Sequence, residues 1–309
     1  MGTNARKQFD IGAFVGGLVF GLSGFFAARI WAGHVDVIAA ASWMPWVVYT
    51  NVKCQMSRRR QSGYGASATN VKWKTYCVLA AAVFALQLLA GYQTMAFMTA
   101  IAVLIVTLLL CYFVKSFKPL VRMALAVALG LGLAAIQIIP LQEFFRQSIR
   151  TFNFPYSWNS YGSLTIASLK QFLNPFFFGD QISYHGPPPN FAEHAFFVGR
   201  VGVVLIIFFL LRRLPRLPRS PMVLAFGCVA FFGLWISLGP NAPIDLQYLL
   251  WKIVPMYRYL RLPPRHLILV VFGLSGLIGL GLQRFNKPFS FLIALFISAE
   301  MILYARHFI

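Results

Sequence analysis

Carboxylates and imidazoles occur in three short polar segments that interrupt the long apolar runs of the chain. A positioned carboxylate can take a proton from a hydroxyl group, and a neighbouring imidazole can assist that transfer. Ionisable groups are costly at a membrane boundary and usually line a cavity when they occur there. The candidate catalytic residues are His34, Asp36, Asp180, Glu193 and His194.

The turn that carries His34 and Asp36 also has a simpler interpretation. An Ala-Gly pair directly precedes these polar residues, and the same arrangement occurs again at Ala90-Gly91-Tyr92. Glycine supplies the open backbone that a tight helical hairpin needs. Ordinary turn chemistry therefore competes with a functional site at this position.

Residues 239–265 contain Arg258, Arg261 and Arg265 against a single acid, Asp245. The planar arginine side chain can bind phosphate through two parallel hydrogen bonds. Prolines in the same segment interrupt regular helix and would hold the arginines in place. The cluster predicts a phosphate-binding site for a lipid-linked substrate. The alternative is that these side chains only reach the phosphates of membrane lipids.

The sequence contains no recognisable set of metal ligands. Its four cysteines have no paired spacing, and none lies within residues 140–197 or 239–265, so neither a disulfide nor a zinc site is predicted. No cofactor is predicted. If a divalent ion binds, the carboxylate oxygens of the candidate acids would suit magnesium or manganese.

Membrane helices must position these residues. Of the 309 residues, 59% are hydrophobic and 11% are charged, whereas a soluble chain usually carries about 25% charged residues. Apolar runs long enough to cross a bilayer recur without the alternation of a β-barrel. The fold class is therefore all-α, a single polytopic transmembrane domain over 1–309 with about nine spans. The predicted spans are 11–28, 35–50, 76–90, 93–114, 120–139, 196–211, 221–238, 267–283 and 288–304.

Two large loops are predicted on one face of the membrane. Residues 140–197 are rich in aromatic side chains, which favour the depth of the lipid headgroups, so this loop should lie at the outer interface. Residues 239–265, with the arginine cluster, form the second outer loop. In the first span, Gly12, Gly16, Gly17, Gly21 and Gly24 form ridges of small residues, including the Gly17–Gly21 spacing, that allow helix backbones to approach closely. The glycines of 267–283 predict the same close packing.

The distribution of lysine and arginine predicts a cytoplasmic N-terminus. Cytoplasmic connections retain basic residues, and with this orientation the inner segments hold most of the 27 bases and only one acid, Asp10. The net charge of +20 therefore indicates topology and contact with anionic lipids, and it does not indicate nucleic-acid binding. The predicted inner bases are Arg6, Lys7, Lys53, Arg58, Arg59, Arg60, Lys72, Lys74, Lys115, Lys118, Arg122, Arg212, Arg213, Arg216, Arg219, Arg284 and Lys287.

Short motifs spread over most of the chain resemble the YfhO family of bacterial membrane proteins, which is placed with the GT-C glycosyltransferases. Each motif is weak alone, and their order and spacing carry the resemblance. The motifs are Gly21-Leu-Ser-Gly-Phe-Phe26, Gly33-His34, Ser42-Trp-Met-Pro45, Gln87-Leu-Leu-Ala-Gly-Tyr92, Asn174-Pro-Phe-Phe-Phe-Gly179, Glu193 with Phe197-Val-Gly199, Leu238-Gly-Pro-Asn-Ala-Pro243, Val254-Pro-Met-Tyr-Arg258 and Arg261-Leu-Pro-Pro-Arg265.

The resemblance implies an enzyme of the bacterial inner membrane. Such an enzyme transfers a sugar from a polyprenyl-phosphate donor to an acceptor at the extracytoplasmic face, with inversion at the anomeric carbon. The family usually carries its catalytic aspartate in the first outer loop, and no acidic outer loop precedes Gly12 here. The chain is therefore expected to be N-terminally short relative to the family, an incomplete copy in which Asp36 would substitute.

Two other functions remain open from the sequence. One is a non-catalytic membrane scaffold, which the missing aspartate loop favours. The other is a carrier for lipid-linked or anionic solutes. A carrier usually has polar groups at the bilayer midplane, whereas here they gather at the boundary and Glu300 is nearly alone within a span.

Overall fold

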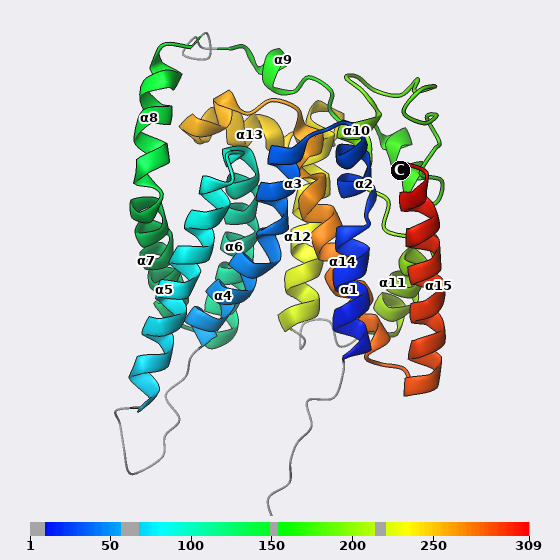
Figure 1. Ribbon diagram of the computed structural model, residues 1–309, viewed down its shortest axis with the longest axis horizontal. Coiled ribbons are helices and arrows are strands. Elements are labelled where there is room, and N and C mark those ends of the chain that lie inside the picture. Colours follow the sequence, from blue (N-terminus) through cyan, green and yellow to red (C-terminus); the bar gives the residue numbers. More distant parts are fainter. Residues whose placement is uncertain (1–9, 57–67, 149–153, 214–220, 309) are drawn as a thin grey trace, which may run out of the picture.

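The computed structural model describes residues 10–56, 68–148, 154–213 and 221–308. All regular elements in these ranges are helices, which confirms the all-α class (Figure 1). Several of the predicted inner bases, among them Arg6, Lys7, Arg58 to Arg60, Arg216 and Arg219, lie outside the described residues.

Helices occupy all nine predicted segments, and short helices lie in the loops. The first half of the chain contains α1 (Ile11–Gly21), α2 (Gly24–Trp31), α3 (Val35–Ser42), α4 (Met44–Met56), α5 (Ala68–Leu89), α6 (Gln93–Val114), α7 (Lys118–Leu133) and α8 (Ala135–Arg146). The second half contains α9 (Tyr156–Asn159), η2 (Ile166–Phe172), α10 (Phe191–His194), α11 (Arg200–Arg213), α12 (Pro221–Leu238), η4 (Gly239–Asn241), α13 (Leu246–Ile253), η5 (Pro255–Tyr259), η6 (Pro263–His266), α14 (Leu267–Leu282) and α15 (Lys287–Arg306).

Five helical stretches among the described residues are long and apolar enough to cross a bilayer, and a sixth is possible if α7 and α8, which meet at 75°, form one broken span. The number is below nine because α3 and α4 are separate short helices, and the apolar parts of α5 and α11 are shorter than a full span. The five stretches are Ile11–Trp31, Gln93–Val114, Pro221–Asn241, Pro263–Leu282 and Lys287–Arg306.

The helices run side by side, and the long connections gather at one end of the bundle. This end, at the top of Figure 1, carries α10 and α13 and is called the loop end below. The α2–α3 turn also lies there, as does the C-terminus of α15. Bases predicted to be cytoplasmic, such as Lys53, Lys118 and Lys287, lie near helix termini at the opposite end.

Helix α14 forms the centre of the second half of the bundle. Its span is 72% buried, and it packs against α1, α11 and α12. A Cβ atom on Gly12 of α1 would lie 2.3 Å from the carbonyl oxygen of Gly279, so the two backbones are in direct contact. Gly17 and Gly21 have no such neighbour within 4 Å. The predicted close packing is therefore confirmed at Gly12 and Gly16, which meet α14, and at Gly24, which meets the backbone of Phe196 and Phe197. It is wrong for the Gly17–Gly21 pair, because these two glycines lie on another face of α1.

The boundary of the first predicted outer loop also needs correction. Helix α8 continues through Pro140 to Arg146, so the connection begins later than residue 140. Several aromatic side chains of this loop pack into the protein: Phe191 is 3% exposed, and the ring of Phe176 lies 5.8 Å from that of Tyr304 on α15. The loop is thus tied to the bundle through its rings.

The second predicted loop, 239–265, is largely helical. It contains α13 and three short 3-10 turns, of which η5 begins at Pro255 and η6 at Pro263. Leu262 adopts a left-handed backbone with φ of 67° directly before the proline pair. This turn changes the chain direction and brings Arg265 to the top of α14.

Candidate functional site

A polar cavity of about 240 Å³ lies at the loop end of the bundle. Four of the eight predicted site residues line it, namely His34, Asp36, Glu193 and Arg265. The remaining lining comes from Arg29, Val37, Tyr92 and Met95. The cavity therefore joins the α2–α3 turn, α10, the start of α6 and η6.

The α2–α3 turn places His34 and Asp36 at the cavity. Gly33 has a positive φ of 70°, which glycine adopts without steric cost, and the His34 amide donates to the carbonyl oxygen of Arg29 at 3.0 Å. Asp36 then lies in the first turn of α3, where a negative charge is favoured by the helix dipole. Its side chain is exposed, and it remains available to a ligand.

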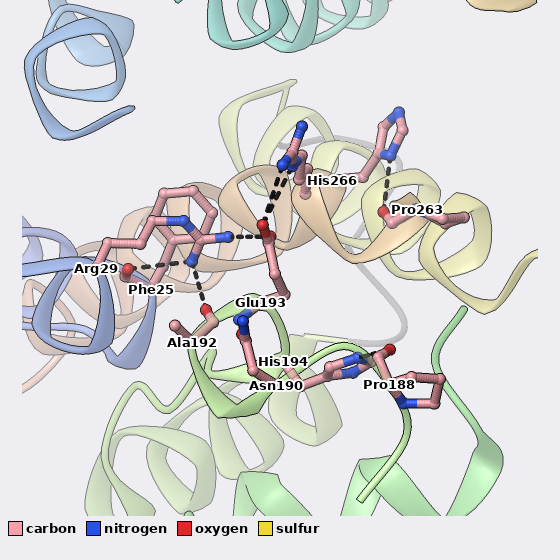
Figure 2. A network of polar contacts seen from close by, with 10 residues as sticks. Phe25, Arg29, Pro188, Asn190, Ala192, Glu193, His194, Pro263 and His266 are labelled. Carbon is pink, nitrogen blue, oxygen red and sulfur yellow. Dashed lines mark hydrogen bonds and ion pairs between the residues drawn. The ribbon is translucent and has the colours of Figure 1, made fainter. Parts of the chain in front are cut away.

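Glu193 is held in place by a one-turn helix and by two arginines. The Asn190 side chain caps α10 by accepting a hydrogen bond from the Glu193 amide at 3.1 Å. The Glu193 carboxylate accepts from Nη2 of Arg29 at 3.0 Å and from Nη2 of Arg265 at 3.1 Å. The two arginines come from different elements, Arg29 from α2 and Arg265 from η6. Figure 2 shows the ion pair between Arg29 and Glu193.

Arg29 belongs to the site although the sequence analysis did not select it. Its guanidinium is 1% exposed and donates to the carbonyl oxygens of Phe25 at 3.2 Å and Ala192 at 2.9 Å. The group also lies 3.6 Å from the centroid of the Phe25 ring. The available signal was a lone arginine near the end of an apolar run, which implies a buried partner.

The charge of Glu193 is stabilised by these contacts. Burial would raise the pKa of the carboxyl, but the charges of Arg29 and Arg265 outweigh burial and hold the pKa below its ordinary value. A carboxylate with a lowered pKa and two charged donors is a weak proton acceptor. Glu193 is therefore suited to orienting Arg265, and Asp36 is the better candidate for a base.

Arg265 presents the accessible positive charge of the cavity. Its side chain is 24% exposed, compared with 6% for Glu193, and its guanidinium lies 5.6 Å from the centroid of the Tyr92 ring. Burial raises the pKa of the Tyr92 phenol, so Tyr92 stays a neutral hydrogen-bonding group. A ligand can approach the part of the Arg265 guanidinium that Glu193 does not contact.

The other two arginines of the predicted cluster do not line this cavity. Arg258 donates to the carbonyl oxygens of Trp251 and Lys252 and lies over the Trp251 ring. Arg261 lies over the ring of Tyr161, with 4.4 Å from the guanidinium carbon to the ring centroid. Of the three arginines that were predicted to form one phosphate site, only Arg265 lines this cavity, so the three do not form a single cluster.

Asp180 and His194 are also placed away from the cavity lining. One oxygen of Asp180 accepts from the Ser183 amide and hydroxyl and from the Ile182 amide, and these hydrogen bonds, those of Ser183 first, lower its pKa. His194 is 1% exposed and bonds to the Pro188 carbonyl, and burial lowers its pKa. Both residues serve the conformation of the 180–194 segment.

The cavity, called the first cavity below, brings two arginines together with the carboxylates of Glu193 and Asp36 and the imidazole of His34. It can therefore offer a ligand both a positive charge, on Arg265, and a carboxylate, on Asp36. Within the described part of the chain, no group of three or more histidine, cysteine or acidic residues is arranged to hold a metal ion.

Comparisons with protein-family models, with curated proteins and with solved structures find no match for this chain. Its functional interpretation therefore depends on the geometry of the cavity and on the residues that line it.

Proposed function

We propose that this chain is a membrane glycosyltransferase of the GT-C type, similar to the YfhO family. It transfers a sugar from a polyprenyl-phosphate donor to an acceptor hydroxyl at the extracytoplasmic face of a bacterial inner membrane. In this proposal the chain crosses the membrane nine times with a cytoplasmic N-terminus, and the loop end faces outward. Anionic lipids contact the opposite, basic end.

The donor phosphate would bind at Arg265. The buried Arg29 is neutralised by Glu193, and the same carboxylate orients Arg265 from one side. The exposed side of the Arg265 guanidinium is left for a phosphate oxygen, with charge-assisted hydrogen bonds. These bonds strengthen as the phosphate becomes a leaving group, so they favour the transition state.

Asp36 and His34 would handle the acceptor proton. The acceptor oxygen forms a bond to the anomeric carbon while the bond from that carbon to the phosphate oxygen breaks, and the electron pair leaves with the phosphate. The acceptor proton passes to the Asp36 carboxylate, with His34 assisting. The products are the glycosylated acceptor and polyprenyl phosphate, and attack from the face opposite the phosphate gives inversion.

The observation that carries this proposal is that Asp36, His34 and Arg265 line one cavity of about 240 Å³. A base and a phosphate ligand must be near each other for this reaction. The residues come from two elements that are far apart in the chain, and the tertiary structure brings them together.

The test is transfer of labelled sugar from polyprenyl-phosphate donors by the full chain in nanodiscs. Arg265→Gln removes a charge-assisted contact and should slow transfer by about 10- to 100-fold. Asp36→Asn removes the base and should slow it by about 100-fold or more while donor binding persists.

Arg258→Gln is the matched control, because this arginine lies outside the cavity and should leave the rate unchanged. Thermal unfolding of each variant separates loss of chemistry from loss of the fold. Absence of transfer by the folded wild-type chain with every donor would contradict the proposal.

The alternatives are a non-catalytic scaffold and a carrier for lipid-linked or anionic solutes. One observation bears on the scaffold and another on the carrier. Glu193 is engaged in ion pairs, as expected for a structural group. Glu300, the candidate for a transported charge, instead accepts a hydrogen bond from the Val201 amide at 3.1 Å and lies 3.7 Å from Arg200. Glu300 therefore caps the start of α11. Because its charge is used there, the carrier function has little support.

A further inference from the structure

A second cavity of about 620 Å³ adjoins the first cavity at the loop end. His34 lines both cavities. Ala192 lines the second one, and its carbonyl oxygen accepts the hydrogen bond from the buried Arg29 of the first, as Figure 2 shows. The two cavities therefore share a wall made by the α2–α3 turn and α10.

The second cavity has a different chemistry from the first. Among the described residues that line it there is no aspartate, glutamate, lysine or arginine. The lining combines the rings of Trp31 and Tyr184 with the side-chain amides of Gln181 and Asn190. Aromatic faces attract weakly positive C–H groups, and amides both donate to and accept from hydroxyl groups. This combination suits a neutral, hydroxyl-rich ligand.

Two lining groups are available to such a ligand. Trp31 is 48% exposed although it is a large apolar side chain. The Oε1 atom of Gln181 is shielded from solvent and has no hydrogen-bond partner among the described residues. An unpaired polar atom in such a position is costly. A ligand hydroxyl would satisfy it once the amide turns toward the cavity, which breaks the 3.4 Å hydrogen bond from Nε2 of Gln181 to the His307 carbonyl oxygen.

The loop that carries Gln181 is held in a defined conformation. The Asp180 carboxylate accepts hydrogen bonds from the Ile182 amide at 3.0 Å and from the Ser183 amide at 2.9 Å. The same carboxylate lies 3.9 Å from His307 beyond the end of α15. Asp180, predicted to be a candidate catalytic base, is therefore a positioning residue for the wall of the second cavity.

We infer that the second cavity binds the carbohydrate acceptor, and this inference rests on the proposed function. An acceptor sugar in contact with Trp31 and Gln181 would present a hydroxyl toward His34, the residue common to both cavities. The donor phosphate would lie on the other side at Arg265. The donor's own sugar has the same chemistry as an acceptor, so the experiment must distinguish the two.

The experiment measures binding of neutral and anionic soluble glycans to the full chain in nanodiscs on a glycan array, followed by competition. Wild type should bind neutral glycans, and Trp31→Ala should weaken that binding about tenfold through loss of ring contact. Trp46→Ala is the matched control, since Trp46 is 60% exposed on α4 and lies outside the cavity. Gln181→Ala and its control Gln142→Ala provide a second pair.

The outcomes separate this inference from the proposed function. Binding of polyprenyl phosphate should depend on Arg265 and be insensitive to Trp31→Ala. If no neutral glycan binds wild type, or if Trp31→Ala and Trp46→Ala behave alike, the acceptor assignment is wrong. If Trp31→Ala weakens only a sugar-bearing donor, the cavity holds the donor sugar and the acceptor assignment fails. Glycan binding that needs Trp31, without lipid-phosphate binding at Arg265, would instead refute the proposed function.

Discussion

The carboxylate of Glu193 lies 3.0 Å from Nη2 of Arg29, a residue 164 positions earlier in the chain. This ion pair joins α2 to α10, and both of its residues line the first cavity. Because Arg29 is almost completely buried, its charge has no access to water and depends on this partner and on two carbonyl oxygens.

Removing one partner of this pair should destabilise the protein strongly. Arg29→Met leaves the Glu193 carboxylate buried with only Arg265 as a charged partner, and breaking a buried pair in this way costs about 3 kcal/mol or more. Thermal unfolding in detergent measures the loss. The double variant Arg29→Met with Glu193→Leu should recover part of it. Arg200→Ala, at a pair whose arginine is 62% exposed, should change stability by less than about 1 kcal/mol. Equal effects at both sites would contradict the assigned role.

Glu193 should make stability depend on pH in the acid range. Its folded pKa is below the ordinary value of 4.5, so the folded state binds this proton less readily than the unfolded state. Its contribution is complete above that value and is lost as pH falls through the lower folded pKa. Unfolding midpoints between pH 3 and 7 should show this loss in wild type and lack it in Glu193→Gln. Parallel curves for the two proteins would refute it.

The glycines of α1 should differ in their tolerance of a side chain. Gly12→Ala forces a methyl group toward the Gly279 carbonyl, and such overpacking costs about 1–3 kcal/mol. Gly17→Ala meets no atom within 4 Å and should be neutral or stabilising by up to about 1 kcal/mol, since alanine is the better helix former. Unfolding of the two variants in the same detergent tests this ranking. The reverse order would mean that α1 packs through another face.

Loss of the Asp180 side chain should loosen the loop that carries Gln181 in the wall of the second cavity, and it should leave the first cavity intact. Asp180→Ala removes the acceptor for the Ile182 and Ser183 amides, so their hydrogen exchange should accelerate. Asp180→Asn keeps an acceptor oxygen and should retain most of the protection. Hydrogen–deuterium exchange with mass spectrometry measures both. If hydrogen exchange of the Ile182 and Ser183 amides is unchanged in Asp180→Ala, Asp180 does not position this loop.

Much of the fold was predictable because it depends on local sequence. Apolar runs of near-span length must satisfy their own backbone hydrogen bonds as helices, and each of the nine predicted segments contains helix, although residues 196–199 precede α11. The Gly33 turn was also predictable, since glycine at a positive φ is a local requirement. The end of α8 was missed because Pro140 is tolerated inside a helix when neighbouring groups compensate for the lost hydrogen bond.

The sequence by itself determined the helices, the all-α class and the candidate residues His34, Asp36, Glu193 and Arg265. Only the tertiary structure decided which candidate residues line the same cavity. Residue types and spacing carry no information on which helix ends come together, so the separation of Arg265 from Arg258 and Arg261 was not predictable. Nor was the pairing of Arg29 with Glu193, because a buried charge shows in the sequence only as an exception within an apolar run, and its partner is selected by packing.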